Sequence, residues 1–166
     1  MGTEQEFTEY VGTRWPRLVR SAVLLGCSRP EAEDVVQTAL VRCLTNWSRV
    51  RHADDRDAYV HRVLINTFTS ARRRRWNGEQ PVEVVPEVAG RDEYEERDVA
   101  DAVLRSLGRL PQDQRIAVVL RYYANLDEMQ MASALEVAPG TVKSRLSRAL
   151  RVLADDPTLS DLRGAP

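Results

Sequence analysis

The stretch PGTVKSRLSRAL, residues 139–150, contains three basic side chains and no carboxylate. Its apolar residues Val142, Leu146 and Leu150 recur every four positions, which is the spacing of one face of an α-helix. If these side chains face a core, the basic and hydroxyl side chains between them lie on the exposed sector. The stretch therefore predicts a helix with one apolar face and one cationic face.

The residues before this helix give it a context. Residues 127–135, DEMQMASAL, predict a short helix, and residues 136–138, EVA, predict a tight turn. A helix, a short turn and a helix with a basic outward face form a helix-turn-helix, whose second helix can enter a DNA major groove. The alternative is a solvated basic face without a partner. The candidate DNA contacts on this helix are Thr141, Lys143, Ser144, Arg145, Ser147 and Arg148.

Two more helices precede this motif, over residues 98–110 and 111–123, and Pro111 opens the second of them. Residues 99–154 therefore predict a small helical domain with a net charge of +3. The remaining residues, 155–166, are too short for another domain, and we expect them to form a disordered tail.

An acidic segment lies upstream, at residues 79–98. It contains eight carboxylates against Arg91 and Arg97, two prolines and a glycine, and no sustained hydrophobic period. These features predict a flexible linker. Two interpretations of its acidity stay open: a solvated spacer, and a strand that imitates nucleic acid inside a basic channel.

The N-terminal block, residues 1–78, predicts a small helical bundle. Apolar residues repeat at intervals of three and four over residues 32–47, and Ser28 is placed to cap that helix. An upstream helix is expected to be interrupted near Pro16 and to end at Gly26. No segment alternates with period two, so the predicted fold is all-α: two small helical domains joined by an acidic flexible linker.

A further helix is predicted to begin after Asp57 and to run into four arginines at 72–75. Hydroxyl and amide groups upstream of the arginines are suited to meet base edges. For the aromatic rings of Tyr59 and Trp76 two interpretations stay open, stacking on exposed bases and packing in the core. Phe68 lies on the apolar stripe and is expected in the core. The candidate nucleic-acid contacts on this helix are Asn66, Thr67, Ser70, Arg73 and Arg74.

Charge and composition narrow the function classes. Residues 1–78 carry a net charge of +4. The overall charge of -1 is therefore the sum of two basic blocks and an acidic connector between them. Two basic blocks of this kind indicate a polyanion as partner. No stretch approaches the roughly 20 apolar residues of a membrane span, and the N-terminus lacks the order of a secretory signal. We expect a cytoplasmic protein with no membrane partner. Cys27 and Cys43 match no metal-binding spacing and are expected in the core, and no cofactor is predicted.

The order of the motifs carries a resemblance. The chain contains, in this order, AEDVVQTALVRCL, YVHRVLINT followed by RRRR, an acidic linker, LGRLPQDQRIAVVLRYYANL and GTVKSRLSRAL. This order of motifs resembles that of the extracytoplasmic-function (ECF) sigma factors, the small two-domain members of the sigma-70 superfamily. The match spans about residues 7–154. Arginine-rich composition and VVQTALVR suggest an actinobacterial-type, sigma-E-like subgroup. The implied division is 1–78 as a sigma region 2-like domain, 79–98 as the linker, 99–154 as a sigma region 4-like domain and 155–166 as the tail.

The resemblance implies a promoter-specificity subunit of bacterial RNA polymerase that is not an enzyme. Its partners would be core polymerase and promoter DNA. The contacts with polymerase would be made to the clamp helices of the largest subunit and to the flap of the second-largest. Many members also bind an anti-sigma protein. Residues 49–57 would capture a flipped base of the minus-10 element beside Asn66, Thr67 and Ser70, and Arg121 would join the basic helix on the minus-35 element. The linker would thread towards the polymerase active-site cleft. The implied polymerase contacts are Asp34, Gln37, Leu40, Val41 and Arg42.

Some positions depart from the family pattern. Members often have a glycine where this chain has Glu136, in a turn that prefers positive φ, and serine and glutamate where it has Asp127 and Gln130. An aromatic residue is common where Leu40 and Leu44 stand. These differences weaken any promoter consensus copied from relatives.

Two other classes of protein fit parts of the sequence. A free-standing helix-turn-helix regulator would explain the C-terminal half, although the N-terminal block shows no ligand-sensing signature. An enzyme is the third class, because acidic and histidine residues cluster at His52, Asp54, Asp55, Asp57 and His61. A polar loop with Asp57 capping the next helix is the favoured interpretation of that cluster, since its spacing matches no known ligand set.

Overall fold

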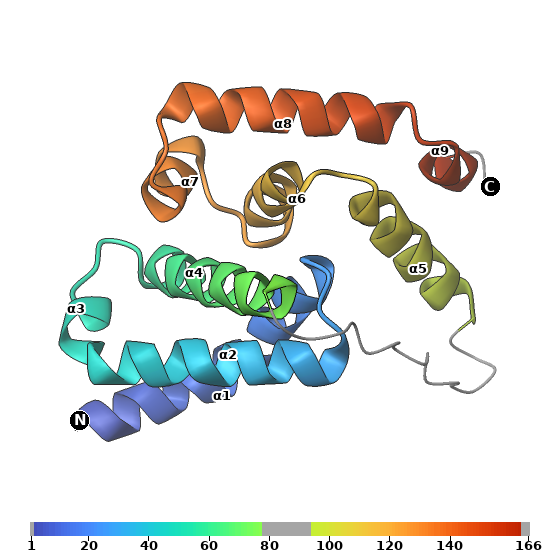
Figure 1. The fold of residues 1–166 in the computed structure, drawn as a ribbon. Coiled ribbons are helices and arrows are strands. Elements are labelled where there is room, and N and C mark those ends of the chain that lie inside the picture. The colour runs from blue at the N-terminus through green and yellow to red at the C-terminus, as the bar shows by residue number, and fades with distance from the viewer. Residues whose placement is uncertain (1, 78–93, 164–166) are drawn as a thin grey trace.

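A computed structural model describes residues 2–77 and 94–163 of the chain. In these residues every regular element is helical, which confirms the predicted all-α fold, and the helices form two small domains (Figure 1). The first domain contains α1 (Thr3–Leu24), α2 (Arg29–Thr45), α3 (Trp47–Arg51) and α4 (Arg56–Trp76). The second contains α5 (Tyr94–Gly108), α6 (Gln112–Val118), the π-helical segment η2 (Val119–Tyr123), α7 (Glu128–Leu135), α8 (Pro139–Ala154) and α9 (Pro157–Arg163).

Helices α1, α2 and α4 pack against one another and enclose the core of the first domain. The largest side chains in this core are Trp47, Leu64 and Phe68, all almost fully buried. The expected cysteines, Cys27 and Cys43, are buried there as well, and burial raises the pKa of each thiol to about 11. Both are therefore neutral, unreactive core residues.

Helix α1 runs without a break through Pro16, so the predicted interruption is wrong. A proline removes one backbone hydrogen bond from a helix, but the apolar face on both sides of it is anchored here by Tyr10, Leu18 and Val19, all buried. The predicted end is confirmed at Gly26, which adopts φ +110°, a region that favours glycine.

The cap of α2 is confirmed. The Ser28 side chain accepts a hydrogen bond from the Glu31 amide, and the Glu31 carboxylate accepts one from the Ser28 amide, forming a capping box. The helix ends at Thr45 rather than at Trp47. Asn46 departs from helical geometry, and Trp47 begins the short α3.

The cap of α4 differs from the expectation. Asp55, not Asp57, is the N-cap, because its side chain accepts a hydrogen bond from the Ala58 amide at 2.8 Å. Asp57 lies in the first turn, where its carboxylate is free to contact α1 instead. Sequence alone offers two aspartates near this helix start, and the geometry of the preceding loop decides between them.

The helix-turn-helix is present as α7 and α8. Asp127 and Gln130 form a capping box at the start of α7. Glu136 ends α7 in the left-handed region at φ 56°, the conformation for which glycine is favoured. Upstream, the helix predicted over 111–123 is divided into α6 and the π-helical segment η2.

Two predictions about the ends of the second domain need correction. Helix α5 begins at Tyr94, inside the predicted linker, and residues 78–93 of that linker lie outside the described residues. The predicted disordered tail contains α9. Its start is fixed by the buried Asp156, whose carboxylate accepts hydrogen bonds from the Thr158 amide and from Arg109, each at 2.9 Å.

The two domains are in direct contact. Helix α7 packs on α4, and η2 packs on α1, so that α6 and α7 lie between α4 and the outer helix α8 (Figure 1). Buried apolar residues of both domains belong to one cluster. Arg115 on α6 donates to the Leu24 carbonyl at 2.6 Å, and Arg17 on α1 donates to the Tyr123 carbonyl at 2.7 Å.

Candidate nucleic-acid interface

The outward sector of α8 is the strongest candidate surface. Val142, Leu146 and Ala149 are buried against the rest of the second domain, because they share one helix face. Leu150, predicted on the same face, is 43% exposed, so that part of the prediction is wrong. The opposite sector faces away from the first domain (Figure 1). Its exposed side chains are Lys143, Ser144, Ser147 and Arg148, while Thr141 and Arg145 are half-buried at its edges.

The basic side chains of α8 differ in whether they already have an ion-pair partner. Lys143 lies 3.6 Å from the Glu128 carboxylate, and Arg145 lies 3.5 Å from that of Asp113. Both are partly exposed ion pairs, which contribute little to stability and exchange readily for another anion. Within the described residues the side chain of Arg148 makes no hydrogen bond or ion pair. Of the three basic side chains predicted to contact DNA from α8, Arg148 is therefore the one without an ion-pair partner in the described residues.

Arg121, the remaining residue predicted on this surface, has a structural contact. It is exposed on η2, and its guanidinium donates to the Leu126 carbonyl at 3.1 Å. That bond ties η2 to the segment that enters α7. The other N–H groups of the Arg121 guanidinium remain free to donate hydrogen bonds to a phosphate.

On α4 the predicted contacts fall into two groups. Asn66, Ser70, Arg73 and Arg74 are exposed. Thr67 is only 2% exposed, so the prediction that it contacts DNA does not fit its position. Its hydroxyl donates to the Val63 carbonyl at 2.7 Å. Thr67 lies on the core face beside the apolar stripe, and its polar group is satisfied inside the protein.

The four arginines at 72–75 also fall into two groups, one with structural contacts and one without such contacts in the described residues. Arg72 donates to the Gly26 carbonyl at 3.1 Å and covers the Phe68 ring, and Arg75 pairs with Glu31. These two arginines hold α4 against the α1–α2 corner. Of the aromatic candidates, Tyr59 is half-buried, Phe68 is buried as expected and Trp76 is 92% exposed.

On α2 the predicted polymerase face is partly exposed. Asp34, Gln37 and Val41 face solvent, and Val41 is 62% exposed although apolar. Leu40 is only 5% exposed, so its assignment to a docking surface does not fit. Arg42 is exposed and donates to the Thr67 hydroxyl at 3.1 Å, which links α2 to α4.

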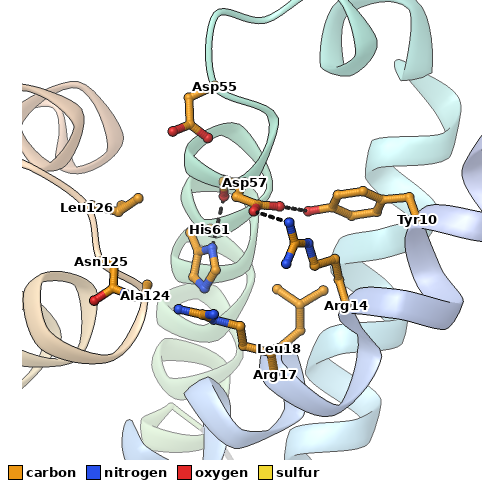
Figure 2. Close-up of a pocket in the computed structure, with 10 residues that line it drawn as sticks. All are labelled: Tyr10, Arg14, Arg17, Leu18, Asp55, Asp57, His61, Ala124, Asn125 and Leu126. Atoms are coloured by element: carbon orange, nitrogen blue, oxygen red, sulfur yellow. Dashed lines mark hydrogen bonds and ion pairs between the residues drawn. The ribbon is translucent and has the colours of Figure 1, made fainter.

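The acidic and histidine cluster considered as an enzyme site is a set of structural contacts (Figure 2). Asp57 accepts a hydrogen bond from the Tyr10 hydroxyl at 2.8 Å and pairs with Arg14 at 2.9 Å. His61 is buried, with Nδ1 2.9 Å from the Asp57 carbonyl and Nε2 3.3 Å from the Ser21 hydroxyl. In the described part of the chain no three histidine, cysteine or acidic residues are grouped to hold a metal ion.

Burial of His61 predicts a pH dependence of stability. Burial is the main cause that lowers the pKa of His61 in the folded protein, because charging the imidazole there is unfavourable. The unfolded chain binds this proton more readily. The free energy of unfolding is therefore expected to be highest above about pH 6.5 and to fall below it, by up to about 1.4 kcal/mol per pH unit.

Chemical denaturation between pH 7.5 and 5.5 measures this slope. His61→Gln is expected to flatten it. His52→Gln is the matched control, since His52 is exposed and is the only other histidine. An unchanged slope in His61→Gln would show that other groups cause the dependence.

Sequence reasoning missed the residues that join the two domains. The side-chain amide of Gln130 donates to Asp55, and Arg62 pairs with Glu136. Arg17 and Arg115 reach backbone carbonyls of the opposite domain. These pairs leave no local signal, since their members are far apart in the chain. The departures at Gln130 and Glu136 were the only indication that these positions are unusual.

An all-helical protein with a helix-turn-helix and an exposed cationic recognition helix is a DNA-binding protein by class. Residues 13–78 match sigma-70 region 2, and residues 100–153 match sigma-70 region 4. The chain is 39% identical to the RNA polymerase sigma-E factor of Streptomyces coelicolor, over 98% of this chain and 92% of that relative. It is 32% identical to the ECF sigma factor SigM of Mycobacterium tuberculosis, over 92% and 78% respectively. The chain belongs to the ECF sigma factors and is an RNA polymerase sigma factor.

Solved structures agree with this membership. The sigma factor RpoE of Bartonella quintana, solved in complex with the anti-sigma factor NepR, superimposes with a TM-score of 0.75 at 26% identity, over 94% of this chain and 98% of that one. CnrH, solved with the cytosolic domain of CnrY, shares the fold with a TM-score of 0.64 at 20% identity, over 91% and 86%. Among the described residues no helix is long and apolar enough to span a membrane.

Proposed function

We propose that this sigma factor directs transcription initiation by holding core polymerase through α2, the minus-10 element through α4 and the loop before it, and the minus-35 element through α8. The observation that carries the proposal is the outward sector of α8. It is cationic, has no carboxylate from 139 to 153 and leaves Ser144, Ser147 and Arg148 without side-chain partners in the described residues. Such a sector on a recognition helix matches the chemistry of a major groove.

For the minus-35 element, we assign base contacts to Arg148 and Ser144 near the middle of the exposed sector. Arginine donates two parallel hydrogen bonds to guanine, and serine accepts or donates one. Lys143 and Arg145 are better suited to phosphates, because their carboxylate partners already hold them at the edges of the sector. Thr141 lies in the first turn of α8, where free backbone N–H groups suit a phosphate.

For the minus-10 element, Asn66 and Ser70 offer exposed hydrogen-bonding groups one helical turn apart on α4. Arg73 and Arg74 follow them and supply positive charge for the backbone. Residues 49–57, named here the minus-10 loop, run from the end of α3 through the connecting residues 52–55 into the first turn of α4 and precede this face. Thr67 is buried beneath this face, where its hydroxyl accepts a hydrogen bond from Arg42, and we do not assign it a contact with DNA.

For core polymerase, Asp34, Gln37 and Val41 are the exposed residues of α2 that fit a docking surface. Val41 and Leu44 are exposed apolar side chains three positions apart on α2, and a contiguous exposed apolar patch supports a protein contact more than a single residue does. By family membership the partners are the clamp helices of the largest subunit and the flap of the second-largest. An anti-sigma protein is a further candidate partner, supported by the complex of the Bartonella relative with NepR.

The proposal assigns no catalysis to this chain, and its site of action is the cytoplasm, where polymerase and promoter are found. A free-standing helix-turn-helix regulator is the alternative. It would need the second domain alone, whereas the match to sigma-70 region 2 covers residues 13–78.

Run-off transcription tests the proposal. Purified protein and bacterial core polymerase transcribe a fragmented GC-rich bacterial genome, and the RNA 5′ ends are sequenced. Discrete starts that share two upstream elements are expected, and they should vanish when Asp34 and Gln37 are both changed to alanine. Both side chains are exposed, so the double variant is expected to fold normally. Random starts, with a core preparation that responds to another sigma factor, would favour the free-standing regulator.

A further inference from the structure

We propose that Glu128 on α7 and Asp113 on α6 compete with DNA for two of the basic side chains of α8, so that the recognition helix binds DNA weakly unless polymerase holds it at a promoter. This inference rests on the proposed function of α8 and deepens it. Helices α6 and α7 both pack against α8 (Figure 1), so the ion pairs concerned lie within the second domain.

Two of the three basic side chains assigned to the minus-35 element on α8 already have an anionic partner. Lys143 Nζ lies 3.6 Å from a carboxylate oxygen of Glu128, and Arg145 Nε lies 3.5 Å from one of Asp113. Arg148 makes no hydrogen bond or ion pair within the described residues. In that part of the chain, Arg148 is therefore the one of these three charges that meets DNA without a carboxylate beside it.

Both carboxylates are accessible to an approaching polyanion. The side chain of Glu128 is 41% exposed and that of Asp113 is 51% exposed. Glu128 is also the first residue of α7, and in a helix-turn-helix the helix before the recognition helix crosses the DNA backbone. A phosphate that approaches Lys143 must displace the Glu128 carboxylate or remain close to it, and either event weakens the contact between lysine and phosphate.

These ion pairs affect DNA binding more than they affect folding. A partly exposed ion pair adds little to the stability of a fold. The attraction between basic side chains and phosphates, in contrast, supplies most of the affinity of a protein for DNA of any sequence. Each of the two carboxylates therefore withholds one positive charge from the phosphates, while the helices themselves depend on their buried apolar faces.

The two carboxylates are expected to act with different strength. Lys143 carries its charge at a single ammonium group on a side chain that is 67% exposed, so Glu128 faces the whole of that charge. Arg145 is 25% exposed and faces Asp113 through Nε, and its guanidinium has further N–H donors for a phosphate. Loss of the Glu128 carboxylate should therefore have the larger effect.

The consequence is that DNA binding depends on polymerase. With two of its charges paired internally, α8 of the free chain gains little from the phosphates of any DNA it meets. On polymerase, the surfaces for the minus-10 and minus-35 elements act together at a high effective concentration. Contacts that are weak one by one are then sufficient at a promoter.

Binding of the full chain to DNA without polymerase tests the competition. The probe is a fluorescent duplex of mixed sequence at low salt, because phosphate contacts carry no sequence information. Glu128→Gln is expected to raise the affinity about two- to fivefold, the range for loss of a partly exposed ion pair. Asp113→Asn should raise it by less. The plot of log affinity against log salt should steepen by up to about 0.9 in Glu128→Gln, since one more positive charge meets the phosphates.

Two controls separate competition from a general gain of positive charge. Glu33→Gln removes a carboxylate that is also 41% exposed and paired with an arginine, but on α2, and it should leave the affinity unchanged. In a Lys143→Gln background, Glu128→Gln should give no further gain, because the lysine for which it competes is gone. The midpoint of thermal unfolding should stay within about 4 °C of the parent chain in all these variants.

The outcomes separate this inference from the proposed function. No gain in Glu128→Gln, an equal gain in Glu33→Gln, or an equal gain in the Lys143→Gln background would overturn the competition and leave the proposed function in place. If no variant binds the duplex at low salt, the expected gain is absent and the competition is overturned as well. If the parent chain binds and neither Lys143→Gln nor Arg148→Ala lowers its affinity, α8 is not the DNA surface, and the proposed function of α8 fails together with the inference.

Discussion

Replacing Trp47 with alanine is expected to lower the free energy of unfolding by about 3–5 kcal/mol, the cost of truncating a large aromatic side chain in a core. Trp47 is only 2% exposed. Its ring meets Phe7 edge-on at 5.2 Å and lies 5.7 Å from Tyr10, and the Arg56 guanidinium covers it at 5.4 Å. It therefore holds the start of α1, the α2–α3 junction and the start of α4 together.

Denaturant unfolding followed by circular dichroism measures this loss. Trp76→Ala is the matched control, because Trp76 is 92% exposed and its truncation is expected to change stability by less than about 0.5 kcal/mol. The Trp47 indole N–H has no hydrogen-bond partner among the described residues, so Trp47→Phe should lose much less than Trp47→Ala. A loss below about 1 kcal/mol for Trp47→Ala would mean that the core re-forms around the cavity.

Arg148→Ala is expected to weaken minus-35-dependent initiation by about 1–3 kcal/mol and to relax the preference at one promoter position, if Arg148 reads a base. The physical reason is its free guanidinium. Its side chain has no competing partner in the described residues, so its donors are available to guanine, and alanine leaves those base acceptors unmatched.

Transcription from a library of minus-35 variants measures both effects. Arg105→Ala is the matched control, since Arg105 is exposed on α5, outside the helix-turn-helix, and its loss should leave the preference unchanged. A uniform loss over all library members would identify Arg148 as a phosphate contact. No loss would remove it from the interface.

The sequence predicted most of the helices, because helical periodicity and capping are local. The Ser28 cap, the glycine end of α1 and the apolar faces of α4 and α8 depend on residues three or four positions apart. The failures had a different origin. Pro16 was expected to break α1, but tertiary packing on both sides of it outweighs one lost hydrogen bond. The predicted tail became α9 because the buried Asp156 binds Arg109, 47 positions away.

The candidate surfaces were predicted less completely than the helices. The polar and charged residues predicted on α8 are mostly exposed, yet Thr67 and Leu40 are buried. The spacing of three and four already placed both residues on the apolar faces of their helices. Their assignment to binding surfaces therefore went against a periodicity that was right. Asp57 was expected to cap α4 and instead binds Tyr10 and Arg14. The geometry of the loop before α4 gives the cap to Asp55 and leaves Asp57 free to contact α1.

The sequence by itself determined an all-helical chain with a helix-turn-helix and the sigma-factor family, since these follow from short-range patterns and from the order of motifs. Only the tertiary structure decided that α7 packs on α4. The side-chain contacts between these helices join residues 74 and 75 positions apart, and no periodicity connects such positions. Contacts at that separation depend on how two already folded surfaces fit, which local sequence patterns do not encode.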